Sequence, residues 1–230
     1  MNQIDSTYAL PRVMGQQYIL SSIIEESADT ITYAASQKDM RRDVIVETLR
    51  PQAAMEPRKV RFFIETARMQ TRLEHPSVAA PLELLEAEGT WHLAKEKIKG
   101  EPLDMMVSNG RVLPSEVICG LMQQLCRACI YMDMERIACA PFALEHTYLM
   151  ETGFRFDNMA LAGPRPRNAS MHYLANAARL IAPLLDMNAV LATPLLRIME
   201  HMRLAGAWRP LSPVLFIEDL SRLQMEMQRC

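Results

Sequence analysis

The chain has no excess of charge of one sign, no long apolar run and no paired pattern of cysteines. Its 230 residues carry a formal net charge of −2, so nucleic acid and anionic membranes are not expected as general partners. No apolar stretch reaches the roughly 18 residues that a membrane-spanning helix needs. Residues 1–13 also lack the basic-then-apolar order of a signal peptide. These absences argue against a membrane-embedded or secreted protein.

The five cysteines are an odd number and do not have the spacing of a zinc site. This favours a reducing compartment and predicts a cytoplasmic location. Cys119, Cys126 and Cys129 fall on one face of a predicted helix and are interpreted as buried core residues. Cys139 has no general base beside it in the sequence, so we expect it to be unreactive.

Hydrophobic periodicity predicts a mixed α+β chain. Strands are expected at residues 18–25, 30–36, 44–49, 82–87 and 91–97, with a helix over 56–73 after the third of them. The second half is mostly helical, with helices over 114–135, 171–185, 193–205 and 212–229 and short strands at 147–150 and 154–156. This predicts an N-terminal extension, a sheet-containing lobe and a helical lobe, at residues 1–17, 18–99 and 100–230.

Short motifs follow one another along the chain in this order: Thr32-Tyr33-Ala34-Ala35, Val44-Ile45-Val46-Glu47, Val60–Ala67, His75-Pro76-Ser77-Val78, Lys95–Gly100 and Arg209-Pro210-Leu211-Ser212. Their order and spacing resemble the protein kinase-like superfamily, with the bacterial Ser/Thr kinases nearest in pattern. The resemblance covers most of the chain. It implies a bilobal fold in which a five-stranded antiparallel sheet and one helix, αC in kinases, form the N-lobe.

The same resemblance implies a shortened helical C-lobe. Only residues 163–170 stand where kinases carry a longer activation segment, and no Ala-Pro-Glu motif follows. In the family the glutamate of that motif pairs with an arginine like Arg209. We therefore expect Arg209 to have another partner or to be solvated, and we expect no platform for a peptide substrate.

The residues that should contact phosphate depart from the family pattern. Kinase glycines let the backbone N–H groups of one loop approach the phosphates. The equivalent positions here are Glu25, Ser27 and Thr30, with Glu26 and Asp29 between them. Three carboxylates would face a polyphosphate of the same sign, so this loop is expected to repel it.

The positions of the catalytic residues are also changed. The resemblance implies these replacements: Glu47 for the phosphate-binding lysine, Pro141 for the catalytic aspartate, Ala143 for the catalytic-loop lysine, His146 for the metal-binding asparagine and Asn158 for the metal-binding aspartate. A neutral asparagine is a poor ligand for Mg²⁺, which relies on carboxylates and phosphates. Ile45 and Tyr148 add volume where the purine would insert. We therefore expect no catalytic residue, no bound metal and no nucleotide cofactor.

One compensation is predicted from charge. In kinases the strand lysine pairs with the αC glutamate, but here Glu47 and Glu65 would meet. Two carboxylates at ~4 Å repel by about 4 kcal/mol at an effective dielectric constant of ~20. Lys95 stands at the position whose side chain points into the same pocket. It is predicted to bridge one or both glutamates and to hold the helix; the alternative is that the helix swings outward and each carboxylate meets water.

The sequence therefore predicts a catalytically inactive pseudokinase that acts as a scaffold or allosteric regulator for a protein partner of unknown identity. Two alternatives stay open. An atypical nucleotide-dependent transferase would use acidic residues for a metal, and Glu145, Asp157 and Glu47 are the candidates. A binding module for a cationic small molecule would use Glu25, Glu26, Asp29 and Glu47. The basic residues Arg41-Arg42 and Arg58-Lys59-Arg61 favour a solvated face, with a protein-docking patch as the alternative.

Overall fold

The computed structural model describes residues 10, 12–79, 81–164, 168–208 and 212–229. Most of the expected N-terminal extension and the Arg209-Pro210-Leu211 motif lie outside the described residues, so the predicted role of Arg209 stays a prediction. The chain divides into two compact units. The first consists of Met1–Arg72 and Ala80–Lys97, and the second of Leu73–Ala79 and Ile98–Cys230.

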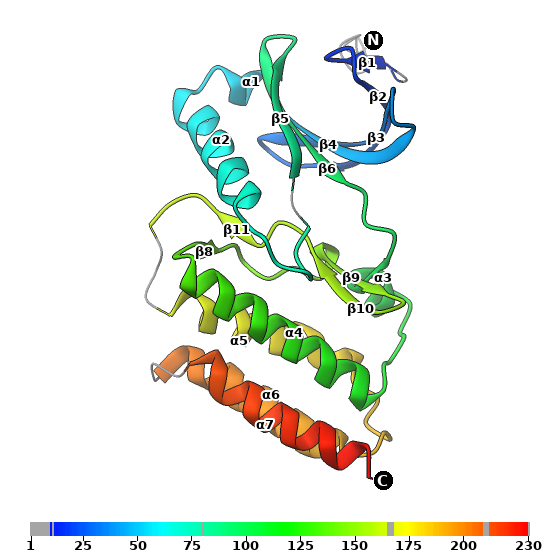
Figure 1. The fold of residues 1–230 in the computed structure, drawn as a ribbon, viewed down its shortest axis with the longest axis vertical. Coiled ribbons are helices and arrows are strands. Elements are labelled where there is room, and N and C mark those ends of the chain that lie inside the picture. The colour runs from blue at the N-terminus through cyan, green and yellow to red at the C-terminus, as the bar shows by residue number, and fades with distance from the viewer. Residues whose placement is uncertain (1–9, 11, 80, 165–167, 209–211, 230) are drawn as a thin grey trace, which may run out of the picture. The chain divides into compact units, whose positions relative to one another are not determined.

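The first unit contains an antiparallel sheet and two helices (Figure 1). Its strands follow the spatial order β1-β2-β3-β4-β6-β5. The strands are β1 (Arg12–Met14), β2 (Tyr18–Glu26), β3 (Thr30–Gln37), β4 (Arg42–Leu49), β5 (Pro81–Ala87) and β6 (Thr90–Glu96). All five expected strands are present. The short strand β1 adds a sixth at the edge, inside the segment that the sequence treated as an extension.

The two faces of this sheet pack differently because neighbouring residues of a strand point to opposite sides. On one face, buried Tyr33 and Val46 belong to a cluster that also includes Met14 of β1. The other face supplies Leu49 and Leu93 to a second cluster. Helices α1 (Pro51–Ala54) and α2 (Pro57–Thr71) complete that second cluster through Ala53, Phe63 and Ala67.

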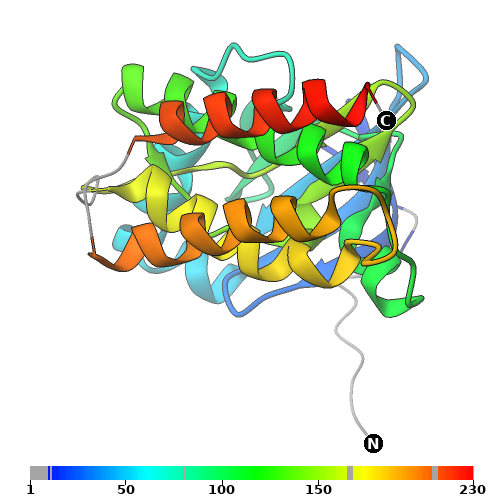
Figure 2. The ribbon, with the colours of Figure 1, turned by 90° about the horizontal axis from the view of Figure 1, so that it is seen from below.

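The second unit is mainly helical, as predicted. Its longest helix, α4 (Ser115–Met134), packs against α5 (Ala169–Ile181) and α7 (Pro213–Met227), and α5 packs against α6 (Ala192–Trp208). Figure 2 views these helices from below and shows α7 beside α4 and α6 beside α5. The predicted helix over 171–185 ends earlier than expected. Pro183 lacks an N–H group, and a short 3-10 turn (Ala182–Leu184) follows α5.

Short elements before and after α4 complete this unit, and those after α4 carry the segments that resemble the kinase catalytic loop. They are β7 (Glu101–Pro102), α3 (Leu103–Ser108), β8 (Ala138–Cys139), a 3-10 turn (Leu144–His146), β9 (Thr147–Met150), β10 (Gly153–Phe156) and β11 (Ala160–Leu161). Strands β10, β9 and β7 form one small sheet, and β8 pairs with β11. Among the described residues, no helix is both long enough and apolar enough to cross a bilayer.

The segment Leu73–Ala79 belongs to the second unit although it follows α2 directly. Backbone hydrogen bonds explain this: the Ala79 N–H donates to the Phe156 carbonyl oxygen at 2.8 Å, and the Phe156 N–H donates to that of Ser77 at 2.7 Å. The ring of His75 also lies 5.6 Å from that of Tyr131 in α4. The second crossing into this unit comes after Lys97, two positions before the boundary that the sequence suggested near Lys99.

Candidate functional site

The residues that the sequence placed in the nucleotide site fall in both units, and each unit is described separately. In the first unit, Lys95 of β6 forms an ion pair with Glu47 of β4, with Nζ 2.9 Å from Oε2. Ile45 pairs directly with Lys95 across the two strands, so Glu47 is the next residue on the same face of β4. The predicted ion pair between Lys95 and Glu47 is present.

The ion pair differs in exposure at its two ends. The Lys95 side chain is 5% exposed, whereas that of Glu47 is 23% exposed. A buried ammonium is costly unless an anion compensates it. The carboxylate that replaces the expected lysine therefore serves as the counter-ion of a neighbouring lysine within the sheet.

Glu65 does not take part in this arrangement, which corrects the prediction that Lys95 holds the helix. The buried face of α2 is defined by Phe63, Ala67 and Gln70, at helical spacing. At 3.6 residues per turn, Glu65 lies about 200° around the helix from Phe63, on the far side. Glu65 is exposed. Its carboxylate has no ion pair within the described part of the chain, so the charge conflict with Glu47 does not arise.

The tip of the β2–β3 hairpin stands where kinases have their glycine-rich loop, and here it is a closed turn. The Ser27 hydroxyl oxygen accepts hydrogen bonds from the backbone N–H groups of Thr30 at 2.9 Å and Asp29 at 3.2 Å. The Ser27 N–H donates to the Thr30 carbonyl oxygen at 2.9 Å. Three backbone donors at this tip are therefore used inside the turn.

Two of the three carboxylates of the same tip, Glu26 and Asp29, have cationic partners, so the acidic charge that the sequence indicated is partly compensated. Arg50 forms an ion pair with Glu26, and its Nε donates to the Ser27 carbonyl oxygen at 2.9 Å. Lys59 of α2 lies 3.0 Å from Asp29. Pairs at such exposed positions contribute about 0–1 kcal/mol each. They nevertheless lower the net negative charge that the tip presents.

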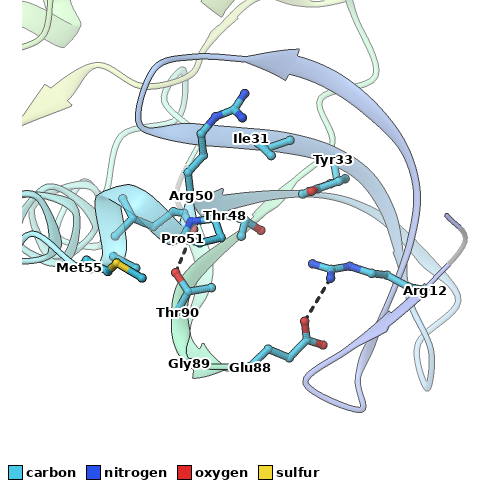
Figure 3. A pocket seen from close by; sticks show the side chains of 12 residues that line it. Arg12, Ile31, Tyr33, Thr48, Arg50, Pro51, Met55, Glu88, Gly89 and Thr90 are labelled. Atoms are coloured by element: carbon cyan, nitrogen blue, oxygen red, sulfur yellow. Dashed lines mark hydrogen bonds and ion pairs between the residues drawn. The ribbon is translucent and has the colours of Figure 1, made fainter. Parts of the chain in front are cut away.

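A cavity of about 210 Å³ lies in the first unit and was not predicted (Figure 3). Its wall includes Thr48, which points to the face of the sheet opposite to Glu47. Arg12 and Glu88 form an ion pair across it at 3.3 Å, drawn as a dashed line in Figure 3. None of the residues that the sequence placed in the nucleotide site lines this cavity.

In the second unit, the segment that the sequence aligned with the kinase catalytic loop is held by strand pairing and by side-chain contacts. Cys139 of β8 pairs with Ala160 of β11. The Asn176 side-chain amide donates to the Phe142 carbonyl oxygen at 3.1 Å, and the Phe142 ring packs edge-on against Tyr173. Pro141, which the resemblance aligns with the catalytic aspartate, is exposed. The proline ring has no side-chain group that could accept a proton from a substrate hydroxyl.

His146 and Asn158, which the resemblance aligns with the two metal ligands of kinases, contact each other. The Asn158 amide nitrogen lies 3.3 Å from His146 Nε2 and 3.5 Å from its Nδ1. The adjacent Asp157 carboxylate accepts a hydrogen bond from the Asn158 N–H at 2.7 Å. An amide and an imidazole can share a hydrogen bond, but they lack the anionic oxygens that Mg²⁺ prefers. No group of three His, Cys, Asp or Glu residues within the described ranges is placed to hold a metal ion.

The other predicted site residues are placed as follows. Ala143 and Glu145 flank the same loop, the first half-buried and the second exposed. Ile45 and Tyr148 are both half-buried and belong to different units. Their predicted role in filling a purine site stays a prediction.

The cysteines of α4 are confirmed as core residues. Cys119, Cys126 and Cys129 are fully buried. Burial raises the pKa of Cys119 to about 11 and that of Cys126 to about 12. Because the thiolate is the reactive form, these thiols are expected to be inert in the folded protein. Cys139 is half-buried, with its Sγ 3.8 Å from the Met132 sulfur.

Comparison with solved structures identifies the fold. The kinase domain of PknI from Mycobacterium tuberculosis superposes with a TM-score of 0.72 at 16% identity, covering 95% of this chain and 99% of that domain. A mutant of the same domain gives a TM-score of 0.70 at 16% identity, covering 94% and 98%. No protein-family model and no curated protein sequence matches the chain. At this identity the likeness establishes the fold alone: the chain has a protein kinase-like fold, as the order of its motifs predicted.

Proposed function

We propose that this protein is a pseudokinase, a kinase-like domain that neither holds Mg-ATP nor transfers phosphate and that acts through contact with a protein partner. The observation that carries the proposal is the Lys95–Glu47 ion pair. At the strand position where the resemblance implies a phosphate-binding lysine, the chain carries a carboxylate. That carboxylate forms its ion pair with a buried lysine of the neighbouring strand β6, on the same face of the sheet.

The second unit supports the same proposal through the groups that phosphoryl transfer requires. The reaction depends on positioned metal ions and on a residue that orients the nucleophile. Pro141 has no side-chain group that could orient the nucleophile. His146 and Asn158 contact each other and supply no anionic oxygen for a metal ion. With these replacements in the loop, a role as scaffold or allosteric regulator fits better than catalysis. A cytoplasmic location, inferred from the unpaired cysteine pattern, belongs to this proposal.

The two alternatives are less well supported. A cationic ligand would have to displace Arg50 from Glu26, Lys59 from Asp29 and Lys95 from Glu47. Three of the four acidic residues proposed for such a ligand thus already have a cation. An atypical transferase would depend on the two remaining carboxylates of the catalytic-loop region, Asp157 and Glu145.

Thermal unfolding with and without ATP tests the proposal. A ligand at 100 times its Kd would add about 2.7 kcal/mol to the free energy of unfolding and would raise the melting temperature by several degrees. Because we expect no binding, the melting temperature should stay within about one degree of its value without ligand when ATP is added with Mg²⁺ or Mn²⁺. An active bacterial Ser/Thr kinase domain serves as the positive control. A shift of several degrees would overturn the proposal, and its loss in Asp157→Asn would favour the transferase.

A further inference from the structure

The outer flank of α2 forms a groove with α1, and Glu65 is the one residue of the predicted site among those that line it. Its volume is about 510 Å³. Its apolar part is made by Ala54 of α1 and by Pro57, Val60 and Ile64 of α2. Met55, which joins the two helices, is 83% exposed. The groove lies wholly within the first unit.

Helical periodicity explains why this flank is available. Phe63, Ala67 and Gln70 direct one side of α2 into the core. Pro57, Ile64 and Arg68 recur at intervals of seven and four residues and so form a second stripe beside it. At 1.5 Å per residue, the stripe from Pro57 to Arg68 is about 16 Å long. This length matches about three turns of an opposing helix.

The rim of the groove is positively charged. Arg61 and Arg68 line it, and Glu65 is its only acidic lining residue. Arg61 and Arg68 make no side-chain hydrogen bond or ion pair with any residue that the structure describes. By contrast, Arg50 and Lys59 of the same unit are paired with carboxylates. The two groove arginines are therefore available to an incoming anion, whose approach they would favour.

Resting on the proposed function, we propose that this groove binds an acidic amphipathic helix of the partner protein. Apolar side chains at positions i, i+4 and i+7 of that helix contact Val60 and Ile64, and its Asp or Glu side chains pair with Arg61 and Arg68. A helix satisfies its own backbone hydrogen bonds, which suits a groove made of side chains rather than of a free strand edge.

A random library of 16-residue displayed peptides tests this proposal, with the purified full chain as bait. The enriched peptides are expected to combine helically spaced apolar residues with Asp or Glu. The affinity of the best peptide is then measured by fluorescence anisotropy. Arg61→Glu and Arg68→Glu should each weaken binding at least about fivefold, because an attraction becomes a repulsion. Arg58→Glu, an equal charge change on the same helix outside the groove, should change it less than about twofold.

Three results would overturn the docking surface: no enriched peptide, enriched peptides without acidic bias, or Arg61→Glu and Arg68→Glu variants that bind the peptide as tightly as the unmodified chain. Light scattering separates a further case, since a dimer that Arg61→Glu converts to a monomer would mean that a second copy occupies the groove. If no peptide binds the groove and ATP leaves the melting temperature unchanged, only the docking proposal is rejected and the pseudokinase proposal stands. A melting temperature raised by ATP while the peptide still binds overturns the pseudokinase proposal instead.

Discussion

Lys95 and Glu47 face different surroundings, although they form one ion pair. Lys95 is nearly enclosed, while Glu47 keeps about a quarter of its side chain exposed, with values of 5% and 23%. The energetic consequence of removing a partner depends on what is left behind. A charge left in a poorly hydrated place costs several kcal/mol, whereas one that reaches water costs little.

Single substitutions in this pair should therefore be unequal. Glu47→Leu removes the anion beside an enclosed ammonium and is expected to lower the free energy of unfolding by about 3 kcal/mol. Lys95→Met leaves a carboxylate that reaches water and should cost about 1 kcal/mol. The double variant, with two apolar side chains of similar size, should approach wild type. Urea denaturation of all four proteins measures the cycle, and equal costs for the two single variants would contradict the argument.

At the same scale, the sequence predicted the partner of Glu47 but not the direction of Glu65. Charge balance alone indicated Lys95, because two carboxylates in one pocket require a cation. The direction of Glu65 depends on which face of α2 is buried. The sequence did not decide this, because the adjacent Phe62 and Phe63 point to different sides of the helix and either could have faced the core. Only Phe63 is buried, while Phe62 is 47% exposed. Counting by 3.6 from Phe63 through Ala67 to Gln70 would have placed Glu65 outside.

At the scale of elements, long periodic segments were predictable and short ones were not. The strand at Thr147–Met150 was predicted with its observed bounds, and α4 to within a residue at each end. Strand β1 exists because Arg12–Met14 pairs with β2, a contact that three residues cannot signal by themselves. Helix α3 and strands β7, β8 and β11 are similarly short and depend on neighbours far along the chain.

Two glycines of the second unit should respond oppositely to alanine. At Gly100, just before β7, an added Cβ would lie 2.8 Å from the Leu149 carbonyl oxygen and 2.6 Å from the Met150 sulfur. Because the nearest rigid atom is backbone, Gly100→Ala is expected to destabilise the protein by about 1–3 kcal/mol. Gly120 lies in α4 with no atom within 4 Å of an added Cβ. Gly120→Ala should stabilise by about 0.5–1 kcal/mol, since alanine favours helix.

Thermal and urea unfolding of the two variants check this pair, with the unmodified chain as reference. A stabilising Gly100→Ala would mean that β9 can move away from residue 100 without loss. A destabilising Gly120→Ala would place a neighbour closer to α4 than the structure does.

At the scale of the whole molecule, each unit contains one histidine with a lowered pKa. His92 of β6 is fully buried, and desolvation lowers its pKa. Its Nε2 lies 3.1 Å from the Ala87 carbonyl oxygen, which can only accept a hydrogen bond, so Nε2 carries the proton. Nδ1 therefore accepts a hydrogen bond from the Thr48 hydroxyl at 2.9 Å. Desolvation and the charge of Arg127 lower the pKa of His75. Its Nδ1 accepts from the Ser77 N–H at 3.2 Å.

Stability is therefore expected to fall in mild acid. Below the ordinary pKa of 6.5 the unfolded chain binds protons that the folded histidines do not, so the free energy of unfolding decreases as pH is lowered through that value. Urea denaturation between neutral pH and mildly acidic pH measures the slope. His75→Gln and His92→Gln each replace the ring with a neutral amide and should flatten it. An unchanged slope in the double variant would show that other groups dominate.

The whole fold was predictable because the order and spacing of the motifs match the kinase pattern even where single residues differ from it. Apolar periodicity placed the main strands and helices, and the resemblance joined them into one architecture. Most of the ion-pair partners of the replaced residues could not be predicted from the sequence. Arg50 with Glu26 and Lys59 with Asp29 connect a hairpin tip to a strand end and to a helix, and their meeting depends on the folded arrangement rather than on local sequence.

The exchange of charge at β4 also bears on how such a chain can change over time. Replacing Glu47 with lysine would restore the residue type that the resemblance implies for an active kinase. In this protein it would put two ammonium groups side by side, because Lys95 lies 2.9 Å from the present carboxylate. A lysine at position 47 would therefore need a matching change at position 95, and the single variant should be less stable than either the present chain or the double variant. The ion pair thus makes positions 47 and 95 depend on each other, so that reversing the charge at one is tolerated only with a matching change at the other.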